Sequence, residues 1–523
     1  MRDRFVEDRL PPADQQPIFL LLDYPERLNA VAELLKGGKP DDLAIINAHG
    51  RWTYAELDDF SGRIARLLVE ERGLVPGNRV LLRGPNGYTM FAAWLGILKA
   101  GGVAVTTMPL LRPGEIATVI DAAEVSHAIV DSRFIGDFRG AMTQTRYVKH
   151  LVKYDGDYGK GELETRCASL KPLDPVDTGR DDPALIAFTS GTTGMPKGCI
   201  QFHRDVLAPC DTFAKTHFRM APGHIVMTSA PIAFTFGLGA TLMFPLAFGA
   251  ATATIEQPSP PAMLDAIMKH GVTHLATAPT AYKAMVSQPA LDEALTTLKC
   301  CLSAGEHLPS AIWAAWKDRT GISIVDGIGS TEMMHIFISE SGDAIRPGST
   351  GRAVPGYEAT VLDAGGNALA EGEGRLAVKG PTGCRYLDDP RQANYVEGGW
   401  NITGDTYRKD ADGYYWYIAR SDDMIVSSGY NIGAPEVENA LLGHPAVAEC
   451  AVIGVPCPER GQKVKAFIVA AANVTPNEAL ISELKNFVKA TIAPYKYPRE
   501  IEFLEALPKT ATGKLRRVDL RAR

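Results

Sequence analysis

Hydrophobic and polar positions follow two alternating periods through the first half of the chain. Residues 79–82, 103–106 and 127–130 are short, nearly continuous apolar runs, which is the pattern of strands buried on both faces. Between these runs, residues 88–100 and 114–123 carry apolar positions at helical spacing. This alternation predicts an α/β fold in which helices cover mostly parallel sheets.

One early helix has a clear start. Thr53 and Glu56 have the spacing of a capping box, in which each side chain accepts a hydrogen bond from the backbone N–H of the other residue. Leu57, Phe60 and Ile64 then lie on one face of the helix that follows. The pattern therefore predicts a helix that begins just after Thr53.

The pattern changes after about residue 345. Glycine and proline become frequent, as in residues 346–358 and 370–383. Such stretches are typical of short strands joined by tight turns. We expect a small β-rich subdomain here, built as a barrel or as an antiparallel sheet.

The C-terminal residues predict a separate small α+β unit. Three runs are strand-like, at residues 448–455, 464–471 and 501–504. Ahead of the third, Thr475 as N-cap, Pro476 in the first turn and Glu478 as the capping-box acid predict the start of a helix. We therefore divide the chain into an N-terminal domain of residues 1–420, a linker at residues 421–422 and a C-terminal domain of residues 423–523.

Composition excludes several classes of protein. Among 523 residues, 54 are Lys or Arg and 61 are Asp or Glu, so the net charge of −7 does not favour a broad basic face for nucleic acid. Eight cysteines without any C-x-x-C pair predict reduced thiols rather than disulfides or structural zinc. The N-terminal sequence MRDRFVEDRL lacks the apolar core of a signal peptide, so we expect a cytoplasmic protein. Its oligomeric state is left open between a monomer and a homodimer.

One long uncharged stretch raises the question of a membrane. Residues 220–255 contain no Asp, Glu, Lys or Arg, and a spanning helix needs about 20 predominantly apolar residues. Helix-breaking residues interrupt the run: Pro231, Gly237, Gly239, Pro245 and Gly249. We expect an interior helix plus loop in a large core, and no membrane partner.

A phosphate-binding loop is the strongest chemical signal. Residues 188–198, FTSGTTGMPKG, follow an apolar strand at residues 184–188. Glycines permit close backbone approach, successive N–H groups form an anion-binding nest, and lysine adds a compact positive charge. The segment is not a Walker A loop, because Pro196 precedes Lys197 and glycine follows it. The alternative, a flexible linker, is disfavoured because the loop adjoins a buried strand.

This loop resembles the signature loop of the adenylate-forming superfamily of acyl- and aryl-CoA synthetases, luciferases and adenylation domains. Further segments resemble family motifs in the family's order: residues 303–306, 326–332, 403–405, 420–423 and 508–514. The resemblance covers roughly residues 40–520. It implies ATP, coenzyme A and Mg²⁺, and a small C-terminal domain that moves.

The resemblance also implies an ATP site. Its residues would contact the triphosphate, the adenine and the ribose: Thr189, Ser190, Gly191, Thr192, Thr193, Gly194, Ala304, Gly305, Glu306, Asp326, Gly327, Ile328, Thr331, Asp405, Arg420 and Lys514. The implied catalytic residues are Lys197, Thr331, Glu332 and Lys514. Asp422 resembles the hinge about which the C-terminal domain turns and delivers Lys514.

These assignments have a chemical basis and a plainer structural alternative. Glu332 is a hard oxygen ligand suited to Mg²⁺, or a surface turn acid. Asp405 can accept hydrogen bonds from two ribose hydroxyls, or form a local turn. Arg420 is a permanent cation for ribose or phosphate, or part of a domain-interface salt bridge. Lys514 can stabilise charge in the transition state, or belong to a solvated basic tail.

The acid substrate is read from two further segments. Benzoate and 2-aminobenzoate CoA ligases are resembled by residues 326–338, DGIGSTEMMHIFI, and by residues 233–239. The 2-aminobenzoate branch in particular is resembled by residues 5–13 and 24–29. The resemblance implies a flat pocket for an aromatic ring, formed by Phe234, Thr235, Gly239, Ser303, Gly327, Gly329, Met334 and His335. Thr235, Ser303 and His335 are candidate contacts of an ortho amine or hydroxyl, which the sequence does not separate. Phe234 and His335 have core interpretations as alternatives.

The acceptor is implied by residues 427–432 and 435–438, which resemble the CoA-ligase form of this region. Ser428, Gly429 and Tyr430 would then contact coenzyme A, with Gly429 lining the pantetheine passage or serving only as a turn glycine. The expected function is an ATP-dependent aryl acid:CoA ligase that forms an aryl-adenylate and then a thioester. The alternatives are an adenylating enzyme that loads a carrier protein, and a non-enzymatic adenylate sensor.

Overall fold

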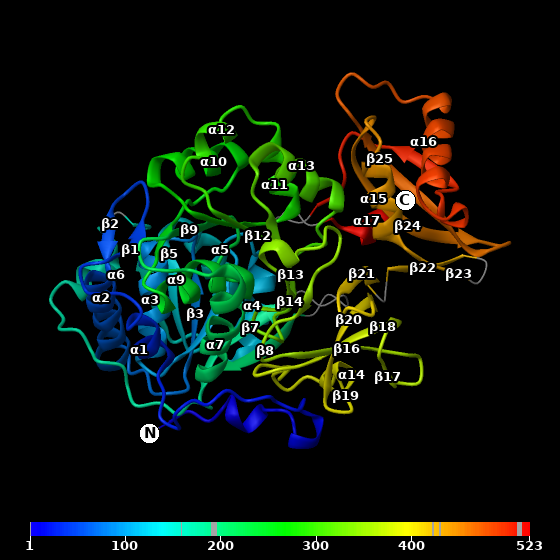
Figure 1. The fold of residues 1–523 in the computed structure, drawn as a ribbon. Helices are drawn as coiled ribbons and strands as arrows, with labels where there is room; N and C mark the ends of the chain where they lie inside the picture. Colours follow the sequence, from blue (N-terminus) through cyan, green and yellow to red (C-terminus); the bar gives the residue numbers. More distant parts are fainter. Residues whose placement is uncertain (1, 158, 190–195, 421–422, 428–429, 510–514) are drawn as a thin grey trace.

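The computed structural model describes residues 2–157, 159–189, 196–420, 423–427, 430–509 and 515–523. These residues form four sheets, three in a large N-terminal part and one in a smaller C-terminal part (Figure 1). Helices cover the parallel sheets, so the predicted α/β fold is confirmed.

The first sheet has the strand order β6-β5-β3-β4-β7-β8. Its strands are β3 (Arg79–Arg83), β4 (Val103–Thr107), β5 (His127–Asp131), β6 (His150–Tyr154), β7 (Pro183–Thr189) and β8 (Lys197–Phe202). Neighbours are parallel except β7 and β8, which are antiparallel. Every residue of β3 and β5 is buried, which explains why their sequences are continuous apolar runs.

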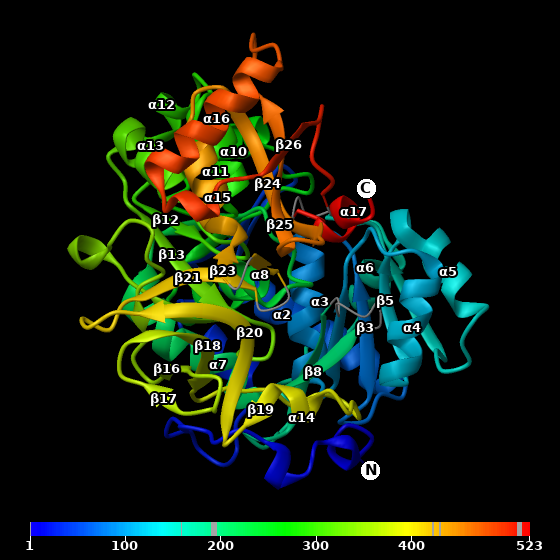
Figure 2. The same ribbon diagram turned by 90° about the vertical axis from the view of Figure 1, so that its right-hand side faces the viewer.

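Helices pack on both faces of this sheet (Figure 2). They are α2 (Tyr54–Arg66), α3 (Tyr88–Lys99), α4 (Pro113–Ala123) and α5 (Ile135–Met142). Successive residues of β3 point to opposite faces, so Leu81 packs in the α4–α5 core and Leu82 in the α2–α3 core. The predicted capping box is confirmed, since Thr53 N donates to Glu56 Oε2 at 2.7 Å and Glu56 N donates to Thr53 Oγ1 at 3.2 Å.

The second sheet has the order β15-β14-β13-β12-β11-β9-β10-β1-β2. Its strands are β1 (Leu43–Ile46), β2 (Arg51–Thr53), β9 (Ile225–Thr228), β10 (Ala251–Ala253), β11 (His274–Thr277), β12 (Cys300–Ser303), β13 (Ile324–Gly329), β14 (Ile336–Ser339) and β15 (Arg352–Ala353). The interior of this sheet, from β13 through β12, β11, β9 and β10 to β1, consists of parallel neighbours. The carboxyl ends of β12 and β13 therefore lie at one edge, and the residues that follow them are neighbours.

Two layers of helices enclose the second sheet. One core contains buried side chains of α10 (Pro260–His270), α11 (Pro279–Val286) and α13 (Ser310–Thr320). The other core is shared with the first sheet, because Val80 of β3 and Leu302 of β12 belong to the same cluster. The two parallel sheets are thus joined into one body.

The uncharged stretch at residues 220–255 is interior, but it is more than the helix plus loop that we expected. It contains β9, α8 (Thr235–Leu238), the helical turn Gly239–Met243, α9 (Phe244–Ala247) and β10. Short apolar runs do not distinguish a buried strand from a buried helix, which explains the two missed strands. In the part of the chain that the structure describes, no helix is long and apolar enough to cross a bilayer.

The glycine- and proline-rich region forms an antiparallel sheet, one of the two predicted forms. Its strands are β16 (Glu358–Leu362), β17 (Ala368–Leu369), β18 (Gly372–Lys379), β19 (Val396–Glu397), β20 (Trp400–Lys409) and β21 (Tyr415–Arg420). This sheet lies beside the parallel sheets and below the C-terminal part in the view of Figure 1. All eight cysteines of the chain are described, and all are free thiols, as predicted.

The C-terminal part has its own sheet and core. It consists of β22 (Met424–Ser427), β23 (Tyr430–Gly433), α15 (Ala434–Leu442), β24 (Val447–Cys457), β25 (Gly461–Ala470), α16 (Glu478–Thr491), β26 (Glu500–Phe503) and α17 (Arg517–Arg521). The chain passes from the third sheet to the fourth between Arg420 and Met424. The assignment of residues 421–422 as a domain boundary stays a prediction, and these two residues lie outside the described part.

The predicted start of α16 was wrong by two residues. Asn477, not Thr475, is the N-cap, since its side chain accepts a hydrogen bond from Leu480 N at 2.9 Å and its backbone is extended at φ −156°. Glu478 is the first helical residue rather than the capping-box acid. Asparagine caps at least as well as threonine, and it stands directly before the first helical residue.

Candidate active site

The base of the phosphate-binding loop is well defined. β7 ends at Thr189, β8 begins at Lys197, and these two residues face each other across the antiparallel pair. The loop therefore leaves and re-enters the sheet at one point, with Lys197 at its end. The five predicted ATP contacts within this loop lie outside the described residues: Ser190, Gly191, Thr192, Thr193 and Gly194.

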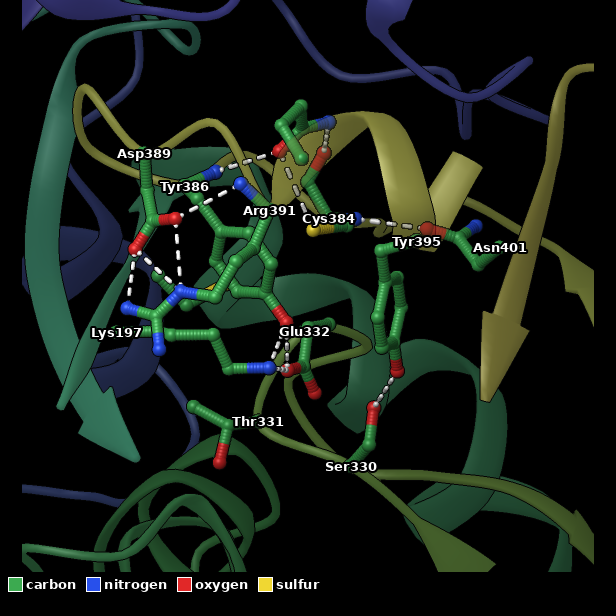
Figure 3. Close-up of polar contacts among 12 residues, drawn as sticks. Lys197, Ser330, Thr331, Glu332, Cys384, Tyr386, Asp389, Arg391, Tyr395 and Asn401 are labelled. Carbon is green, nitrogen blue, oxygen red and sulfur yellow. Dashed lines mark hydrogen bonds and ion pairs between the residues drawn. The ribbon is translucent and has the colours of Figure 1, made fainter. Parts of the chain in front are cut away.

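Three side chains from distant parts of the chain meet at this point (Figure 3). Lys197 Nζ donates to Tyr386 Oη at 2.7 Å, and Tyr386 Oη donates to Glu332 Oε1 at 2.5 Å. Lys197 Nζ and Glu332 Oε1 are 3.8 Å apart. The structure thus brings together two predicted catalytic residues, and it adds a tyrosine that the sequence did not indicate.

The backbone beside Glu332 is held by β8. The buried side chain of Gln201 donates from Nε2 to the carbonyl oxygens of Thr331, at 2.9 Å, and Glu332, at 3.2 Å. Side chains alternate along a strand, so Lys197 and Gln201 point to the same face of β8. The backbone of the predicted catalytic residues Thr331 and Glu332 is therefore fixed relative to β8, which begins at Lys197.

Glu332 is chemically suited to Mg²⁺. Its carboxylate is only 6% exposed, Oε1 accepts from Tyr386, and no donor of the described residues bonds to Oε2. Mg²⁺ is commonly bound by one or two carboxylates together with the phosphates of the substrate. No group of three or more acidic, histidine or cysteine side chains in the described residues could hold a metal. The donor set therefore fits an ion shared with a nucleotide.

The predicted adenine-side residues lie at the carboxyl ends of β12 and β13. Ala304, Gly305 and Glu306 follow β12, and Gly305 has a φ of +89° that favours glycine. Asp326 on β13 pairs with Ser303 on β12, and Gly327 and Ile328 continue β13. The parallel pairing thus brings these two predicted segments to adjacent positions.

Asp326 is held in an environment that opposes ionisation. Its Oδ1 is buried and has no hydrogen-bond partner among the described residues. Burial raises the pKa of Asp326 from the ordinary value of 3.8 to about 8, and the hydrogen bond from the backbone of Gly327 only partly offsets this. The carboxyl group therefore keeps its proton in the ligand-free protein at neutral pH.

Asp326→Asn should raise the thermal stability of the ligand-free protein at pH 8 more than at pH 5. The unfolded chain loses the proton of Asp326 near pH 4 and the folded chain near pH 8, so wild-type stability falls as pH rises across this window. Asparagine cannot ionise, which removes that loss. Melting temperatures at both pH values test this, with the exposed Asp343→Asn as control. An equal effect of Asp326→Asn at the two pH values would contradict it.

The predicted ribose-side residues are paired across two strands. Asp405 on β20 faces Arg420 on β21, and Arg420 Nη1 lies 3.4 Å from Asp405 Oδ1. Asp405 is 8% exposed, whereas Arg420 is exposed. An acceptor and a cation thus lie together at the end of β21, next to the passage into the C-terminal part.

His335 is the centre of the predicted aromatic-acid pocket. It is 2% exposed, and neither ring nitrogen makes a hydrogen bond of good geometry in the described residues, although the backbone of Phe236 is a polar neighbour of the ring. Its ring centroid lies 4.6 Å from that of Phe244, 5.5 Å from that of Phe213 and 5.8 Å from that of Phe236. Burial lowers the pKa of His335 to about 3, so the imidazole is neutral and offers one donor and one acceptor.

Two further polar residues of this region are buried. Ser303 Oγ at the end of β12 has no partner among the described residues, and Thr235 is buried at the start of α8. Unpaired buried polar atoms are costly, so each calls for an explanation. His335 and Ser303, two predicted polar contacts, thus lack hydrogen bonds of good geometry among the described residues, and the choice between a core histidine and a substrate contact stays a prediction.

Glycines let the chain approach His335 closely. A Cβ added to Gly239 would lie 2.7 Å from His335 Nε2, and one added to Gly329 would lie 2.6 Å from His335 O. At Gly327 a Cβ would lie 2.7 Å from Cγ2 of Ile336. These predicted pocket glycines thus serve the packing of β13 and the helical turn Gly239–Met243 against the segment that carries His335.

The residue before His335 adopts a rare conformation. Met334 has a φ of +63° and is fully buried, and His335 N donates to Met333 O at 2.7 Å across it. This three-residue turn is strained for a residue other than glycine.

Phe234 is 38% exposed, so its core interpretation is wrong.

The predicted coenzyme A and domain-motion residues are mostly outside the described part. This applies to Ser428, Gly429, Asp422 and Lys514. Tyr430 is described: it begins β23, is 54% exposed and stacks on Tyr495 with ring centroids 4.5 Å apart. Lys509 and Leu515, the described residues on either side of 510–514, form an antiparallel bridge.

Five site residues were missed by sequence reasoning: Tyr386, Tyr395, Gln201, Phe213 and Phe244. Gln201 and Phe213 lie within ordinary strand and helix patterns. Tyr386 lies in the glycine- and proline-rich region, where no local motif marks it. Only the contacts themselves show their role.

Known proteins resemble this chain along nearly its whole length. The family described as AMP-binding enzyme matches residues 36–385, and the AMP-binding enzyme C-terminal domain matches residues 436–514. A benzoate–CoA ligase of Thauera aromatica is 35% identical over 512 residues, which cover 96% of this chain and 97% of that protein.

Two solved structures also resemble it. That of the anthranilate CoA ligase AuaEII in complex with anthranoyl-AMP has a TM-score of 0.90 at 33% identity, and covers 96% of this chain and 98% of that one. That of a benzoate CoA ligase from Burkholderia xenovorans LB400 has a TM-score of 0.86 at 33% identity, and covers 94% and 100%. The similarity therefore includes both parts of the fold.

Proposed function

The chain belongs to the AMP-binding enzyme family and is an AMP-forming acid–thiol ligase, and we propose that it joins an aromatic carboxylic acid to coenzyme A. The observation that carries the proposal is the buried His335, which packs against Phe213, Phe236 and Phe244 and makes no hydrogen bond of good geometry among the described residues. Flat aromatic walls with a few polar groups suit a planar ring.

A substituted benzoate, 2-aminobenzoate in the first instance, is the proposed acid. His335 and Ser303 each present a buried polar atom without a partner in the described residues. An ortho amine or hydroxyl on the ring would satisfy such groups, whereas an alkyl chain would leave them unpaired. The similarity to a benzoate–CoA ligase and an anthranilate CoA ligase supports the same choice.

The first half-reaction forms the aryl-adenylate. The substrate carboxylate attacks the α-phosphate of ATP, and pyrophosphate leaves. Lys197 and Lys514 offset negative charge on the phosphates, while Asp405 binds the ribose and Asp326 the adenine. Mg²⁺ bound by Glu332 would shield the phosphates. Positioning and electrostatics supply the rate, since no covalent bond to the protein is needed.

The second half-reaction transfers the acyl group. We infer that residues 423–523 turn about Asp422, which removes Lys514 and brings Gly429 and its neighbours to the site. The thiol of coenzyme A attacks the acyl carbon, and AMP leaves. The change from one sheet to another between Arg420 and Met424 supports a pivot at this place.

A substrate screen tests the proposal. Pyrophosphate release is measured with benzoate, 2-aminobenzoate, 2-hydroxybenzoate and a medium-chain fatty acid, and thioester formation is measured with free coenzyme A. We expect the aromatic acids to be preferred and a CoA thioester to form. A preference for the fatty acid would overturn the aromatic assignment. Adenylate without thioester would favour the loading of a carrier protein.

Gly239→Ala should selectively impair the use of aromatic acids. The added Cβ would lie 2.7 Å from His335 Nε2, so the imidazole must shift from the position proposed to contact the substrate ring. We expect kcat/KM for the acid to fall about 10- to 100-fold, while the KM for ATP stays within about twofold. Gly136→Ala in α5 is the matched control, because a Cβ there meets nothing within 4 Å. An unchanged acid kcat/KM would place the ring elsewhere.

A further inference from the structure

Lys197 and Glu332 form a long ion pair, and the hydroxyl of one tyrosine bonds to both of them. In Figure 3 the hydroxyl of Tyr386 contacts the ammonium of Lys197 and the carboxylate of Glu332. It accepts from Lys197 Nζ at 2.7 Å and donates to Glu332 Oε1 at 2.5 Å, while the two charged atoms stay 3.8 Å apart. A direct ion pair would bring them about 1 Å closer.

The chemistry of this position requires a neutral hydroxyl. An ammonium only donates hydrogen bonds and a carboxylate only accepts them, so a group between them must do both. Tyr386 is 1% exposed, and its hydroxyl accepts from Lys197 while it donates to Glu332. The hydroxyl therefore keeps the proton that it donates to Glu332.

The fold holds the tyrosine rigidly at this point. Tyr386 pairs with Cys199 on β8, and on either side Ile200 N donates to Arg385 O and Leu387 N donates to Gly198 O, both at 2.8 Å. Its ring also packs against Tyr395 of α14 (Gln392–Tyr395), with centroids 5.8 Å apart.

Arg385, the buried residue before Tyr386, anchors the same strand-like segment. The guanidinium of Arg385 bonds Asp205 at 2.8 Å and lies between the rings of Phe19 and Phe202. Arg385 and Asp205 are both fully buried. Tyr386 is thus supported by pairing to β8 on one side and by a buried ion pair at the adjacent residue.

We propose that Tyr386 is a positioning residue for adenylate formation. Its hydroxyl keeps Lys197 and Glu332 from approaching each other to the distance of a close ion pair. Each charge then stays available, Lys197 for the phosphates of ATP and Glu332 for their metal ion. This inference rests on the proposed function, because the roles of Lys197 and Glu332 come from it. It assigns no bond-making role to the tyrosine.

Tyr386→Phe tests the inference because it removes the hydroxyl and keeps the ring. Without the hydroxyl, Glu332 Oε1 lacks its neutral donor and attracts Lys197 directly. We expect kcat/KM for MgATP in pyrophosphate release to fall about 10- to 100-fold, and half-maximal rate to need more Mg²⁺. Thioester formation from supplied aryl-adenylate and the KM for the acid should stay within about twofold.

Two comparisons separate positioning from a structural effect. Tyr54→Phe also removes a buried hydroxyl, which bonds Pro245 O and Ala250 O away from this site, and should leave both half-reactions unchanged. In a Lys197→Met background, Tyr386→Phe should lower kcat/KM almost no further. The reason is that the ammonium that the hydroxyl keeps apart from Glu332 is already absent. Additive losses, or equal losses in both half-reactions, would overturn the proposal.

Failure of the proposed function is recognised separately. If wild-type protein makes no adenylate from any aromatic acid, the substrate assignment fails, and the same variants are measured with whichever acid supports pyrophosphate release. Wild-type rates in Tyr386→Phe with that acid would overturn the role of the tyrosine alone.

Discussion

Lys514→Ala should reduce aryl-adenylate formation by about 100- to 10 000-fold while thioester formation from supplied aryl-adenylate is largely retained. The reason is that attack of the carboxylate builds up negative charge at the α-phosphate in the first half-reaction, and the proposed domain rotation removes Lys514 before the second. Lys514 lies outside the described residues, but Lys509 and Leu515, which flank its segment, form a bridge in the C-terminal part. A lysine on such a segment can serve one half-reaction and then be withdrawn.

Single-turnover kinetics of the two half-reactions measure this difference. Lys509→Ala is a suitable control, because Lys509 belongs to the same segment and forms a partly exposed ion pair with Glu449 at 2.7 Å. Loss of an exposed pair has a small effect, so both half-reactions should proceed normally. Equal impairment of both half-reactions by Lys514→Ala would refute the alternating role of the C-terminal domain.

Glu332→Gln should lower adenylate formation by about 100- to 1000-fold and leave thioester formation nearly intact. Glutamine keeps the shape and an acceptor for the Tyr386 hydroxyl, which now bonds Oε1 at 2.5 Å, so the fold should persist. The lost charge removes the hard ligand for Mg²⁺ and the counter-charge of Lys197.

Pyrophosphate release is followed as the Mg²⁺ concentration is raised at constant ATP. We expect the variant to need far more Mg²⁺ for its half-maximal rate than the wild type. Glu162→Gln, in α6 (Glu162–Cys167), also removes a carboxylate from ion pairs and serves as control. A variant with the wild-type dependence on Mg²⁺ would show that another residue holds the metal.

The structure also indicates which hydrogen-bonding groups the proposed acid substrate must supply to His335. Sequence resemblance placed His335 in a pocket, and the coordinates add that its neutral ring makes no hydrogen bond of good geometry in the described residues. The strained turn at Met334 and the contact with Gly239 hold the ring in that position. A substrate with its own hydrogen-bonding substituent would thus be recognised by groups that are otherwise left unsatisfied.

The sequence by itself determined the fold class and the local elements. Continuous apolar runs predicted β3, β4 and β5, and helical spacing with the Thr53–Glu56 capping box predicted α2, because burial and capping leave local periodic signals. The order of motifs likewise identified Lys197, Glu332, Asp326 and His335 as candidates. Where local signals competed, as between Thr475 and Asn477, the prediction was displaced by two residues.

Only the tertiary structure decided which of these residues meet. Lys197 and Tyr386 are 189 positions apart, and Tyr386 and Glu332 are 54 apart, yet one hydroxyl links all three. Strand order and register set such contacts, and neither leaves a local periodic trace in the sequence. The unpaired nitrogens of His335 are likewise visible only when every neighbour is in place, because a missing partner is a property of the packed interior.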